Sequence, residues 1–201
     1  MRIIIISGPS GSGKTSLAKK LMTELNNSYI ISTDNFYKTG YVSNLLSYFI
    51  NSYFDREVSH NEKLLKKTLN KILKNKEINY SYKYDFLKKR TEITYKKFPN
   101  IENLIIEGIF AMKSIKLISN NSYLLIRLKI SKEICMKRIS ERDYIERGKS
   151  RKKSIEDFKK AWNIYHNKEK YYQIKGEGKE LILKKDPNIK NIIEKLSNKN
   201  L

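Results

Sequence analysis

The chain has 201 residues and a mass of 23.8 kDa, a length that suits one domain with a sizeable hydrophobic core. Hydrophobic residues make up 39% and charged residues 31%, and no apolar run reaches the roughly 20 residues of a membrane span, so we expect neither a disordered nor a membrane protein. The net charge is +21, but the lysines are scattered in short pairs; we attribute them to compositional bias and expect no nucleic-acid partner.

Alternating strand and helix patterns predict an α/β fold. Runs of apolar and β-branched residues predict strands at residues 3–6, 29–31, 103–106, 123–130 and 181–183. The first helix places Leu17, Leu21 and Leu25 on one face, and further helical patterns cover residues 61–74, 131–144, 154–172 and those from 187 onward. We therefore predict a single domain over residues 1–201, with a parallel five-stranded sheet and helices on both of its faces.

Residues 78–98 depart from this order. Aromatic and aliphatic residues alternate with polar ones around Tyr80, Tyr82 and Tyr84 and again at Ile93 and Tyr95. Such alternation is typical of β-strands with one covered face, so we predict a β-hairpin inserted into the domain.

The cellular compartment is predicted from the cysteine content and from the amino terminus. Cys135 is the single cysteine, which rules out an internal disulfide framework and fits a reducing compartment. Met1 and Arg2 lead into only four isoleucines before a polar segment, so we expect no signal peptide. We expect a cytoplasmic protein.

A P-loop lies between the first predicted strand and the first predicted helix. The segment from Gly8 to Thr15 reads GPSGSGKT and satisfies the pattern G-x-x-x-x-G-K-[ST]. Its glycines let consecutive backbone N–H groups surround a phosphate, Lys14 can reach the β- and γ-phosphates, and the Thr15 hydroxyl can ligate Mg²⁺. We assign the phosphates of ATP (or GTP) to Gly8, Ser10, Gly11, Ser12, Gly13, Lys14, Thr15 and Ser16.

Two acidic residues follow the second and third predicted strands. Ligands of parallel α/β sheets bind beyond the carboxyl ends of the strands, so Asp34 and Glu107 should face the P-loop. They could ligate the metal or accept the proton of an attacking hydroxyl group. Asp34 could instead be a helix cap or a turn residue. Because both Asp34 and Glu107 are expected at the edge of the sheet that holds the P-loop, we favour a catalytic or metal-binding role.

The segment 138–150 is basic, its helical pattern ends at Gly148, and we interpret the segment as a lid. Arg138, Arg142, Arg147 and Lys149 could neutralise charge on a transferring phosphoryl group. A solvated helix with internal ion pairs is the alternative, because acidic residues are interleaved. The charge pattern alone leaves both open.

Several motifs resemble the uridine kinase (uridine–cytidine kinase) family. Besides the P-loop, the similar segments are STDNFYK at 32–38, FD at 54–55, YDF at 84–86, EGI at 107–109, and RD with ERGK from 142 to 149. Together they touch most of the chain up to about Tyr172. This resemblance implies a nucleoside-kinase-like P-loop fold and a homo-oligomer.

The resemblance also implies roles for individual residues. Asp34 would be the general base for the nucleoside 5′-hydroxyl, Asp55 would bind the ribose hydroxyls, and Tyr84 would pack against the base. The implied sets are catalytic Asp34, Lys14 and Arg142; ATP-binding Arg142 and Arg147 besides the P-loop; metal-binding Thr15, Asp34 and Glu107; and substrate-binding Asp34, Tyr37, Asp55, Tyr84, Arg90 and Lys149.

The chain departs from the family pattern where the base is read. After Tyr84-Asp85-Phe86 the family usually has a histidine in H-[ST]-R, whereas this chain has two lysines before Arg90, and Lys149 replaces an arginine. We predict ATP- and Mg²⁺-dependent phosphorylation of uridine, with cytidine as a further substrate. The alternatives are a P-loop kinase for another alcohol, such as nicotinamide riboside or pantothenate, and a nucleotide-gated nucleic-acid-binding protein.

Overall fold

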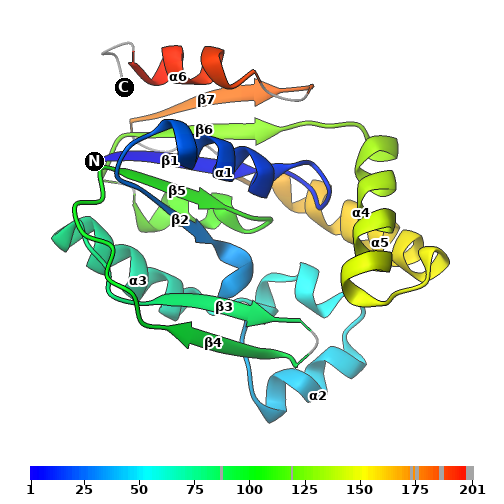
Figure 1. The fold of residues 1–201 in the computed structure, drawn as a ribbon. Coiled ribbons are helices and arrows are strands. Elements are labelled where there is room, and N and C mark those ends of the chain that lie inside the picture. The colour runs from blue at the N-terminus through cyan, green and yellow to red at the C-terminus, as the bar shows by residue number, and fades with distance from the viewer. Residues whose placement is uncertain (87, 119, 173, 175–176, 186–187, 198–201) are drawn as a thin grey trace.

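A parallel sheet crosses the middle of the molecule, and its strands all point toward the same edge (Figure 1). The structure is a computed structural model that describes residues 1–86, 88–118, 120–172, 174, 177–185 and 188–197. Its strands are β1 (Arg2–Ser7), β2 (Ser28–Ser32), β5 (Asn103–Glu107), β6 (Tyr123–Leu128) and β7 (Gly178–Leu183). They pair in the order β2-β5-β1-β6-β7, and every neighbouring pair is parallel. The predicted five-stranded sheet is confirmed.

The isoleucines of β1 build the core on both faces of the sheet. Ile4 and Ile6 pack with α1 (Lys14–Glu24), α4 (Lys132–Arg147), α5 (Arg151–Glu169) and α6 (Ile189–Ser197). Ile3 and Ile5 point to the opposite face and pack with α3 (Glu62–Asn75) and the 3-10 helix η4 (Ala111–Leu117). Successive strand residues face opposite sides, so this short run supports both layers. Burial of each isoleucine contributes about 1.5–3 kcal/mol.

The predicted hairpin is formed by β3 (Ser81–Asp85) and β4 (Arg90–Thr94), which pair antiparallel. A further bridge between Ile78 and Phe98 closes its base. The ring of Phe98 packs on Tyr29 of β2 at 5.0 Å between centroids. The backbone N–H of Tyr84 donates to Oδ1 of Asn35, 3.1 Å away, which ties the hairpin to the segment after β2.

The helices differ from the sequence prediction at one element and at several ends. The helix α2 (Tyr41–Phe49) was not predicted, since its large apolar side chains do not face the core. The helix α4 of the predicted lid ends at Arg147, and Gly148 follows it in the left-handed conformation at φ +60°, at the position where the sequence predicts the end of the helix. The carboxyl-terminal helix begins at Ile189 in the structure, and residues 187 and 198–201 of its prediction lie outside the described residues. None of the described helices has the length and apolarity to cross a membrane.

Candidate active site

Three neighbouring strands bring the chemically important residues to one edge of the sheet. β1 leads into the P-loop, β2 into the 3-10 helix η1 (Thr33–Asn35), and β5 ends at Glu107. In the sheet register, Glu107 lies level with Ile6 of β1 and Ser32 of β2. Glu107 therefore stands between the P-loop and Asp34 of η1.

The P-loop turns tightly ahead of α1. Gly11 has a φ of +80°, and a Cβ at this position would collide with the backbone carbonyl of Cys135 in α4, so only glycine fits this approach of two backbone segments. The buried ammonium of Lys14 donates a hydrogen bond of 2.9 Å to the carbonyl oxygen of Pro9. Burial lowers the pKa of Lys14, while two neighbouring carboxylates raise it.

Thr15 and Glu107 connect the P-loop to β5. The hydroxyl of Thr15 donates to Oε2 of Glu107 over 3.2 Å, and Glu107 is only 2% exposed. A hydroxyl and a carboxylate beside a phosphate-binding loop are oxygen ligands of the kind that Mg²⁺ uses.

Asp34 lies in η1 on the other side of Glu107, with its Oδ1 enclosed. This oxygen has no hydrogen-bond partner among the described residues, although Asp34 as a whole is half-buried. Burial, followed by the nearby Glu107, raises the pKa of Asp34 to about 6, against the opposing effects of Lys14, Arg147 and Arg142. An enclosed carboxylate with an unused oxygen and a pKa near neutrality can accept a proton.

Two neighbours fix the position of η1. Gly108 follows Glu107 with a φ of +136°, and a Cβ there would collide with the hydroxyl of Thr33 and lie 3.2 Å from Oδ1 of Asp34. On the other side, Nε2 of the buried His60 lies 3.2 Å from the carbonyl oxygen of Thr33, to which it donates as N–H. Burial lowers the pKa of His60 to about 4, so it is neutral at physiological pH. His60 therefore supports η1 as an uncharged donor.

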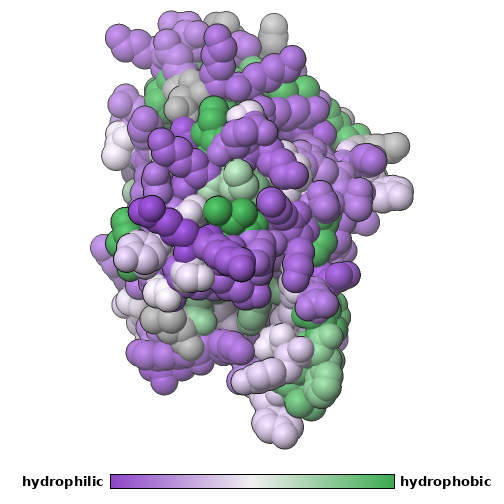
Figure 2. Space-filling model, turned by 90° about the vertical axis from the view of Figure 1, so that its right-hand side faces the viewer, coloured by the Kyte–Doolittle hydropathy of each residue, from purple (hydrophilic) through white to green (hydrophobic). Residues whose placement is uncertain are grey.

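A cleft of about 350 Å³ opens in front of Asp34. The carboxyl-end face of the molecule is mostly hydrophilic (Figure 2). The P-loop, η1, α2 and the segment after it, the hairpin and the lid all contribute to the lining of the cleft. The lining residues are Ser10, Asp34, Tyr37, Ser47, Tyr48, Ile50, Asn51, Ser52, Tyr53, Phe54, Asp55, Phe86, Ile109, Arg142, Arg147, Lys149, Lys153, Asp157 and Lys160.

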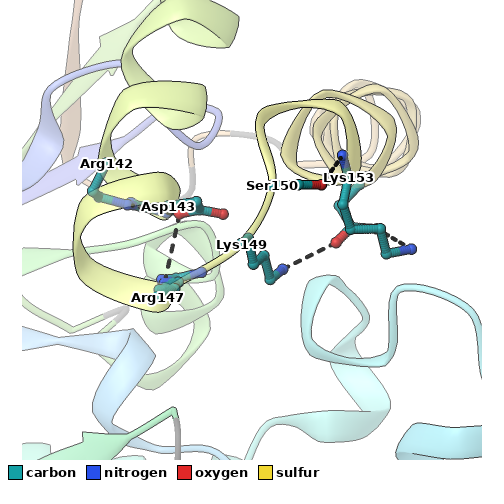
Figure 3. Close-up of polar contacts among 7 residues, drawn as sticks. Arg142, Asp143, Arg147, Lys149, Ser150 and Lys153 are labelled. Carbon is teal, nitrogen blue, oxygen red and sulfur yellow. Dashed lines mark hydrogen bonds and ion pairs between the residues drawn. The ribbon is translucent and has the colours of Figure 1, made fainter.

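The lid arginines are held by one buried carboxylate, that of Asp143. Its Oδ1 accepts hydrogen bonds from Nε and Nη2 of Arg142 at 3.1 and 2.7 Å. Nε of Arg147 forms an ion pair with the same oxygen at 3.6 Å (Figure 3). The guanidinium of Arg147 also lies over the ring of Phe86, 4.5 Å from its centroid. The lid arginines are thus anchored by Asp143, while their side chains line the cleft.

A second set of ion pairs joins the loop after α4 to α5. Nζ of Lys149 lies 3.0 Å from Oδ2 of Asp157, and Nζ of Lys153 lies 3.0 Å from Oδ1 of the same carboxylate. Figure 3 shows Lys149 just before the start of α5 and Lys153 in its first turn, where Ser150 caps the helix by accepting from the backbone N–H of Lys153. These two ion pairs place one more carboxylate and two ammonium groups in the cleft.

An aromatic cluster forms one wall of the cleft. The ring of Tyr37 is packed edge-on at 5.3 Å from Phe54, 5.1 Å from Tyr84 and 5.7 Å from Phe86. Tyr37, Phe54 and Phe86 line the cleft, whereas the buried Tyr84 packs behind them. Tyr37, Phe54 and Phe86 thus give the cleft an aromatic wall, which suits a flat apolar or aromatic ligand.

Asp55 lies in the 3-10 helix η2 (Tyr53–Asp55), next to this wall. It lines both the main cleft and a cavity of about 20 Å³ behind it. Burial, followed by Asp34 and Asp157, raises the pKa of Asp55 to about 6, while Lys149 lowers it. A carboxylate at this place can accept two hydrogen bonds from vicinal hydroxyl groups.

Of the predicted substrate-binding residues, Asp34, Tyr37, Asp55 and Lys149 line the cleft, and Tyr84 and Arg90 lie outside its lining. Of the predicted phosphate- and metal-binding residues, Ser10, Asp34, Arg142 and Arg147 line it as well. Tyr84 lies behind the aromatic wall, and Arg90 lies at the end of the hairpin in an ion pair of 3.2 Å with Glu92, its side chain 61% exposed. The neighbouring Lys89, by contrast, donates to Oγ of Ser47, 3.3 Å away, at the cleft wall.

The helix α2 and the segment that follows it also contribute to the cleft, although no sequence motif points to them. Ser47, Tyr48, Asn51 and Ser52 line the cleft, but they belong to no motif. The signal in the sequence was the lack of charge: residues 39–54 contain no charged side chain in a chain with 31% charged residues. Asp157 and Lys153, also missed as site residues, lie on α5 beyond the recognisable lid motif.

The residues present fit a nucleoside triphosphate and Mg²⁺. The hydroxyl of Ser12 in the P-loop is enclosed and unpartnered among the described residues, and the amide groups at the start of α1 have no acceptor within the helix. The described residues include no group of three or more His, Cys, Asp or Glu side chains able to hold a metal alone. Mg²⁺ does not require one, since it binds through one or two protein oxygens together with substrate phosphates.

Comparison with protein families and with curated proteins gives one consistent match. The model of the phosphoribulokinase / uridine kinase family matches residues 3–174. Uridine kinase of Borrelia duttonii (strain Ly) is 33% identical over 159 residues, which cover 79% of this chain and 75% of that protein. Uridine-cytidine kinase C of Dictyostelium discoideum is 36% identical over 112 residues, which cover 55% of this chain and 23% of that protein. The family match spans every residue that lines the cleft.

Solved structures share the fold at low sequence identity. The protein YFH7 of Saccharomyces cerevisiae has a TM-score of 0.73 at 11% identity, covering 92% of this chain and 93% of that chain. D-glycerate 3-kinase of Cryptococcus neoformans var. grubii has a TM-score of 0.59 at 15% identity, covering 94% of this chain and 86% of that chain. The fold is therefore that of P-loop kinases, as predicted.

Proposed function

The chain belongs to the phosphoribulokinase / uridine kinase family, and we propose that this P-loop kinase phosphorylates the 5′-hydroxyl of a nucleoside, with uridine as its first substrate and cytidine as its second. The observation that carries the proposal is the enclosed, unpartnered Oδ1 of Asp34, which lies between the P-loop and an aromatic-walled cleft. The names of the curated relatives support a nucleoside as the acceptor.

In the proposed reaction, Asp34 accepts the proton of the 5′-hydroxyl group. The oxygen of that hydroxyl group at the same time forms a bond to the γ-phosphorus of ATP. The bond between that phosphorus and the bridging oxygen breaks, so that ADP leaves and the nucleoside monophosphate forms. Lys14, Arg142 and Arg147 supply positive charge around the transferring group, and the anchor at Asp143 fixes the two arginines. Bound Mg²⁺, held by Thr15, Glu107 and Asp34, would neutralise phosphate charge and help orient the phosphates.

The cleft suggests how the nucleoside binds. Asp55 would accept hydrogen bonds from the ribose 2′- and 3′-hydroxyl groups, and Tyr37, Phe54 and Phe86 would contact the base. Lys149 and the nearby Lys89 present donors, which match the O2 and O4 acceptors of uracil. Cytosine has an amino group in place of O4, so we propose a preference for uridine. Arg90, which points away from the cleft lining, has no part in this proposal.

A side-by-side kinetic comparison tests the proposal. Uridine, cytidine, nicotinamide riboside and pantothenate are each incubated with labelled ATP, and kcat/KM is measured. We expect uridine to be used with the highest kcat/KM and cytidine about ten- to a hundredfold less well. Uridine that stays unphosphorylated while nicotinamide riboside or pantothenate is used would leave the kinase assignment intact and refute the nucleoside proposed here.

A further inference from the structure

The helix α5 links the lid to the strand that leads into the P-loop. It begins beside the lid, where Asp157 and Lys160 line the cleft, and it runs back toward the sheet (Figure 1). Phe158, which is buried, packs the helix onto the isoleucines of β1. The last turns of α5 lie near the carboxyl end of this strand, where Ser7 precedes the first glycine of the P-loop.

Tyr165, near the end of α5, makes a direct contact with β1. Its hydroxyl lies 3.1 Å from Oγ of Ser7, although the two residues are 158 positions apart in the sequence. Ser7 is completely buried. Burial, followed by the nearby Glu169, raises the pKa of the Tyr165 hydroxyl, so this group stays protonated. The contact is therefore a hydrogen bond between two neutral hydroxyl groups.

Glu169 adds a second connection between α5 and the sheet. It follows Tyr165 by four residues, so the two side chains lie on the same side of the helix. Its Oε1 lies 3.6 Å from Nη1 of Arg127 in β6, and both side chains are mostly buried. Arg127 lies level with Ser7 in the sheet register. The end of α5 is therefore fixed to the ends of two neighbouring strands.

One face of α5 forms a continuous wall from the cleft to the back of the P-loop. At about 100° per residue, Asp157, Ala161, Tyr165 and Lys168 lie within an arc of about 80°. Asp157 lines the main cleft, and the other three line the cavity of about 20 Å³ behind it. Ser10 of the P-loop lines both spaces. The same helix face thus meets the nucleoside side and the phosphate side of the site.

We propose that Tyr165 is a positioning residue for phosphoryl transfer, because its hydrogen bond to Ser7 fixes the start of the P-loop relative to the cleft. This inference rests on the function proposed above. Two residues after Ser7, the carbonyl oxygen of Pro9 accepts the hydrogen bond of Lys14, and Ser10 follows at the cleft. A shift of Ser7 therefore moves both the partner of Lys14 and the part of the P-loop that faces the nucleoside.

The second half of the P-loop is supported independently of Tyr165. Gly11 lies against the backbone of Cys135 in α4, and Gly13 directly precedes α1. The amide groups at the start of α1, which are suited to bind phosphates, keep these supports when the Tyr165 hydroxyl is removed. We therefore expect the alignment of the nucleoside with the γ-phosphate to suffer more than the affinity for ATP. Misplacement of reacting groups by about 1 Å can lower turnover about a hundredfold.

Single-turnover kinetics of Tyr165→Phe test the proposal, since this change removes only the hydroxyl group. We expect the rate of phosphoryl transfer to fall about tenfold, while the dissociation constant of ATP changes less than about twofold. A rate within about twofold of wild type, or a loss of ATP affinity that accounts for the whole effect, would overturn the proposal.

Tyr29→Phe is the matched control. Tyr29 is buried, and its hydroxyl donates to the carbonyl oxygen of Tyr80 over 3.4 Å. It lies near the amino end of β2, at the edge of the sheet opposite the P-loop. Both variants lose one hydrogen bond and should melt at a lower temperature, but Tyr29→Phe should transfer phosphate at the wild-type rate. Equal rates in the two variants would reduce Tyr165 to a structural role.

A double-mutant cycle shows whether Tyr165 acts through Ser7. Ser7→Ala alone should slow phosphoryl transfer about tenfold, and the double variant should be no slower than either single variant, because both changes remove the same hydrogen bond. An additive loss of about a hundredfold would mean that the two residues act independently, which contradicts the proposal.

All of these rates are measured with the acceptor that the wild-type enzyme uses best in the kinetic comparison described above. If that acceptor is not uridine, the nucleoside proposed above is wrong, but the test of Tyr165 is unaffected. If uridine is phosphorylated and Tyr165→Phe transfers phosphate at the wild-type rate, the proposed function holds and the positioning role of Tyr165 is refuted.

Discussion

At the scale of single residues, Asp34 and Asp55 both have raised pKa values, and the cause is the same for both. The roles that we propose for the two residues are different. Partial burial raises the pKa of each, and the negative charge of nearby carboxylates raises it further. Asp34 lies beside Glu107 and the P-loop, where a proton has to be removed. Asp55 lies beside the aromatic wall, where hydroxyl groups have to be recognised. Buried carboxylates of this kind cost stability and are typical of functional sites.

Replacement of Asp34 by asparagine tests the general base. Asparagine keeps the shape of the side chain but cannot take up the proton, so we expect kcat to fall by about two to four orders of magnitude. The affinity for ATP should stay within a few-fold of wild type, because the P-loop is unchanged. Glu24→Gln, which neutralises an exposed carboxylate at the end of α1, serves as the control and should have normal kcat. Turnover within a few-fold of wild type in Asp34→Asn would remove this residue from the role.

The pH dependence of kcat/KM follows from the raised pKa of Asp34. This parameter reports ionisations in the free enzyme, and the base is active only when it is deprotonated. With a pKa of about 6, kcat/KM should increase as the pH rises toward about 6 and level off above it. If kcat/KM instead reached its plateau near pH 4, the general base would have the pKa of an ordinary carboxyl group, and Asp34 with its raised pKa would not be that base.

Asp55 is tested with the substrate that lacks one of its proposed partners. If Asp55 holds both ribose hydroxyls, 2′-deoxyuridine should have a kcat/KM at least about tenfold below that of uridine, because a buried carboxylate then loses a hydrogen bond. In Asp55→Asn the difference between the two nucleosides should shrink. Equal kcat/KM for uridine and 2′-deoxyuridine in the wild-type enzyme would argue against this placement of the ribose.

At the scale of elements, the lid depends on one buried acid within α4. Asp143→Asn removes the charge that both Arg142 and Arg147 contact, so the two guanidinium groups lose their anchor and repel each other. We expect kcat to fall about ten- to a hundredfold and the KM for ATP to rise. Glu141→Gln, on the exposed side of the same helix, is the control and should behave like wild type. Circular dichroism and melting curves would detect the unfolding that a merely structural role of Asp143 would produce, and unchanged kinetics would contradict the anchor.

The elements that could be predicted from the sequence are those whose information is local. The P-loop, the strand before it and the acids after the second and third strands follow from short patterns, and the structure has them in place. The helix α2 could not be found by searching for a core-facing stripe, because its buried residue is a serine. The sequence pattern around Tyr84 and Arg90 predicts the hairpin, but it does not predict in which direction the two side chains point. Their directions depend on contacts distant in sequence, such as that between Tyr84 and Asn35.

At the scale of the whole molecule, most of the basic charge is dispersed along the chain, but the cleft also has a local excess of cationic side chains. The cleft is lined by five cationic side chains, Arg142, Arg147, Lys149, Lys153 and Lys160, against three carboxylates, Asp34, Asp55 and Asp157. A cleft with this excess attracts polyphosphates, and the scattered lysines add a long-range field of the same sign. The field also attracts polynucleotides, which is the basis of the alternative of a nucleotide-gated nucleic-acid-binding protein.

RNA binding as a function of salt and of bound nucleotide distinguishes these uses of the charge. If the lysines act only as a diffuse field, a uridine homopolymer should bind weakly, and its affinity should fall steeply between about 50 mM and 200 mM salt. Addition of ATP with Mg²⁺ should change that affinity by less than about threefold, because dispersed lysines outside the cleft carry the contact. Asp34→Asn should bind the polymer as wild type does while losing turnover. A nucleotide-gated binder requires the opposite result, since the bound nucleotide must shift the RNA affinity by its differential binding to two states of the protein. A shift of tenfold or more on addition of ATP, persisting at about 200 mM salt, would therefore favour the RNA-binding alternative over a kinase whose positive charge only attracts its substrates.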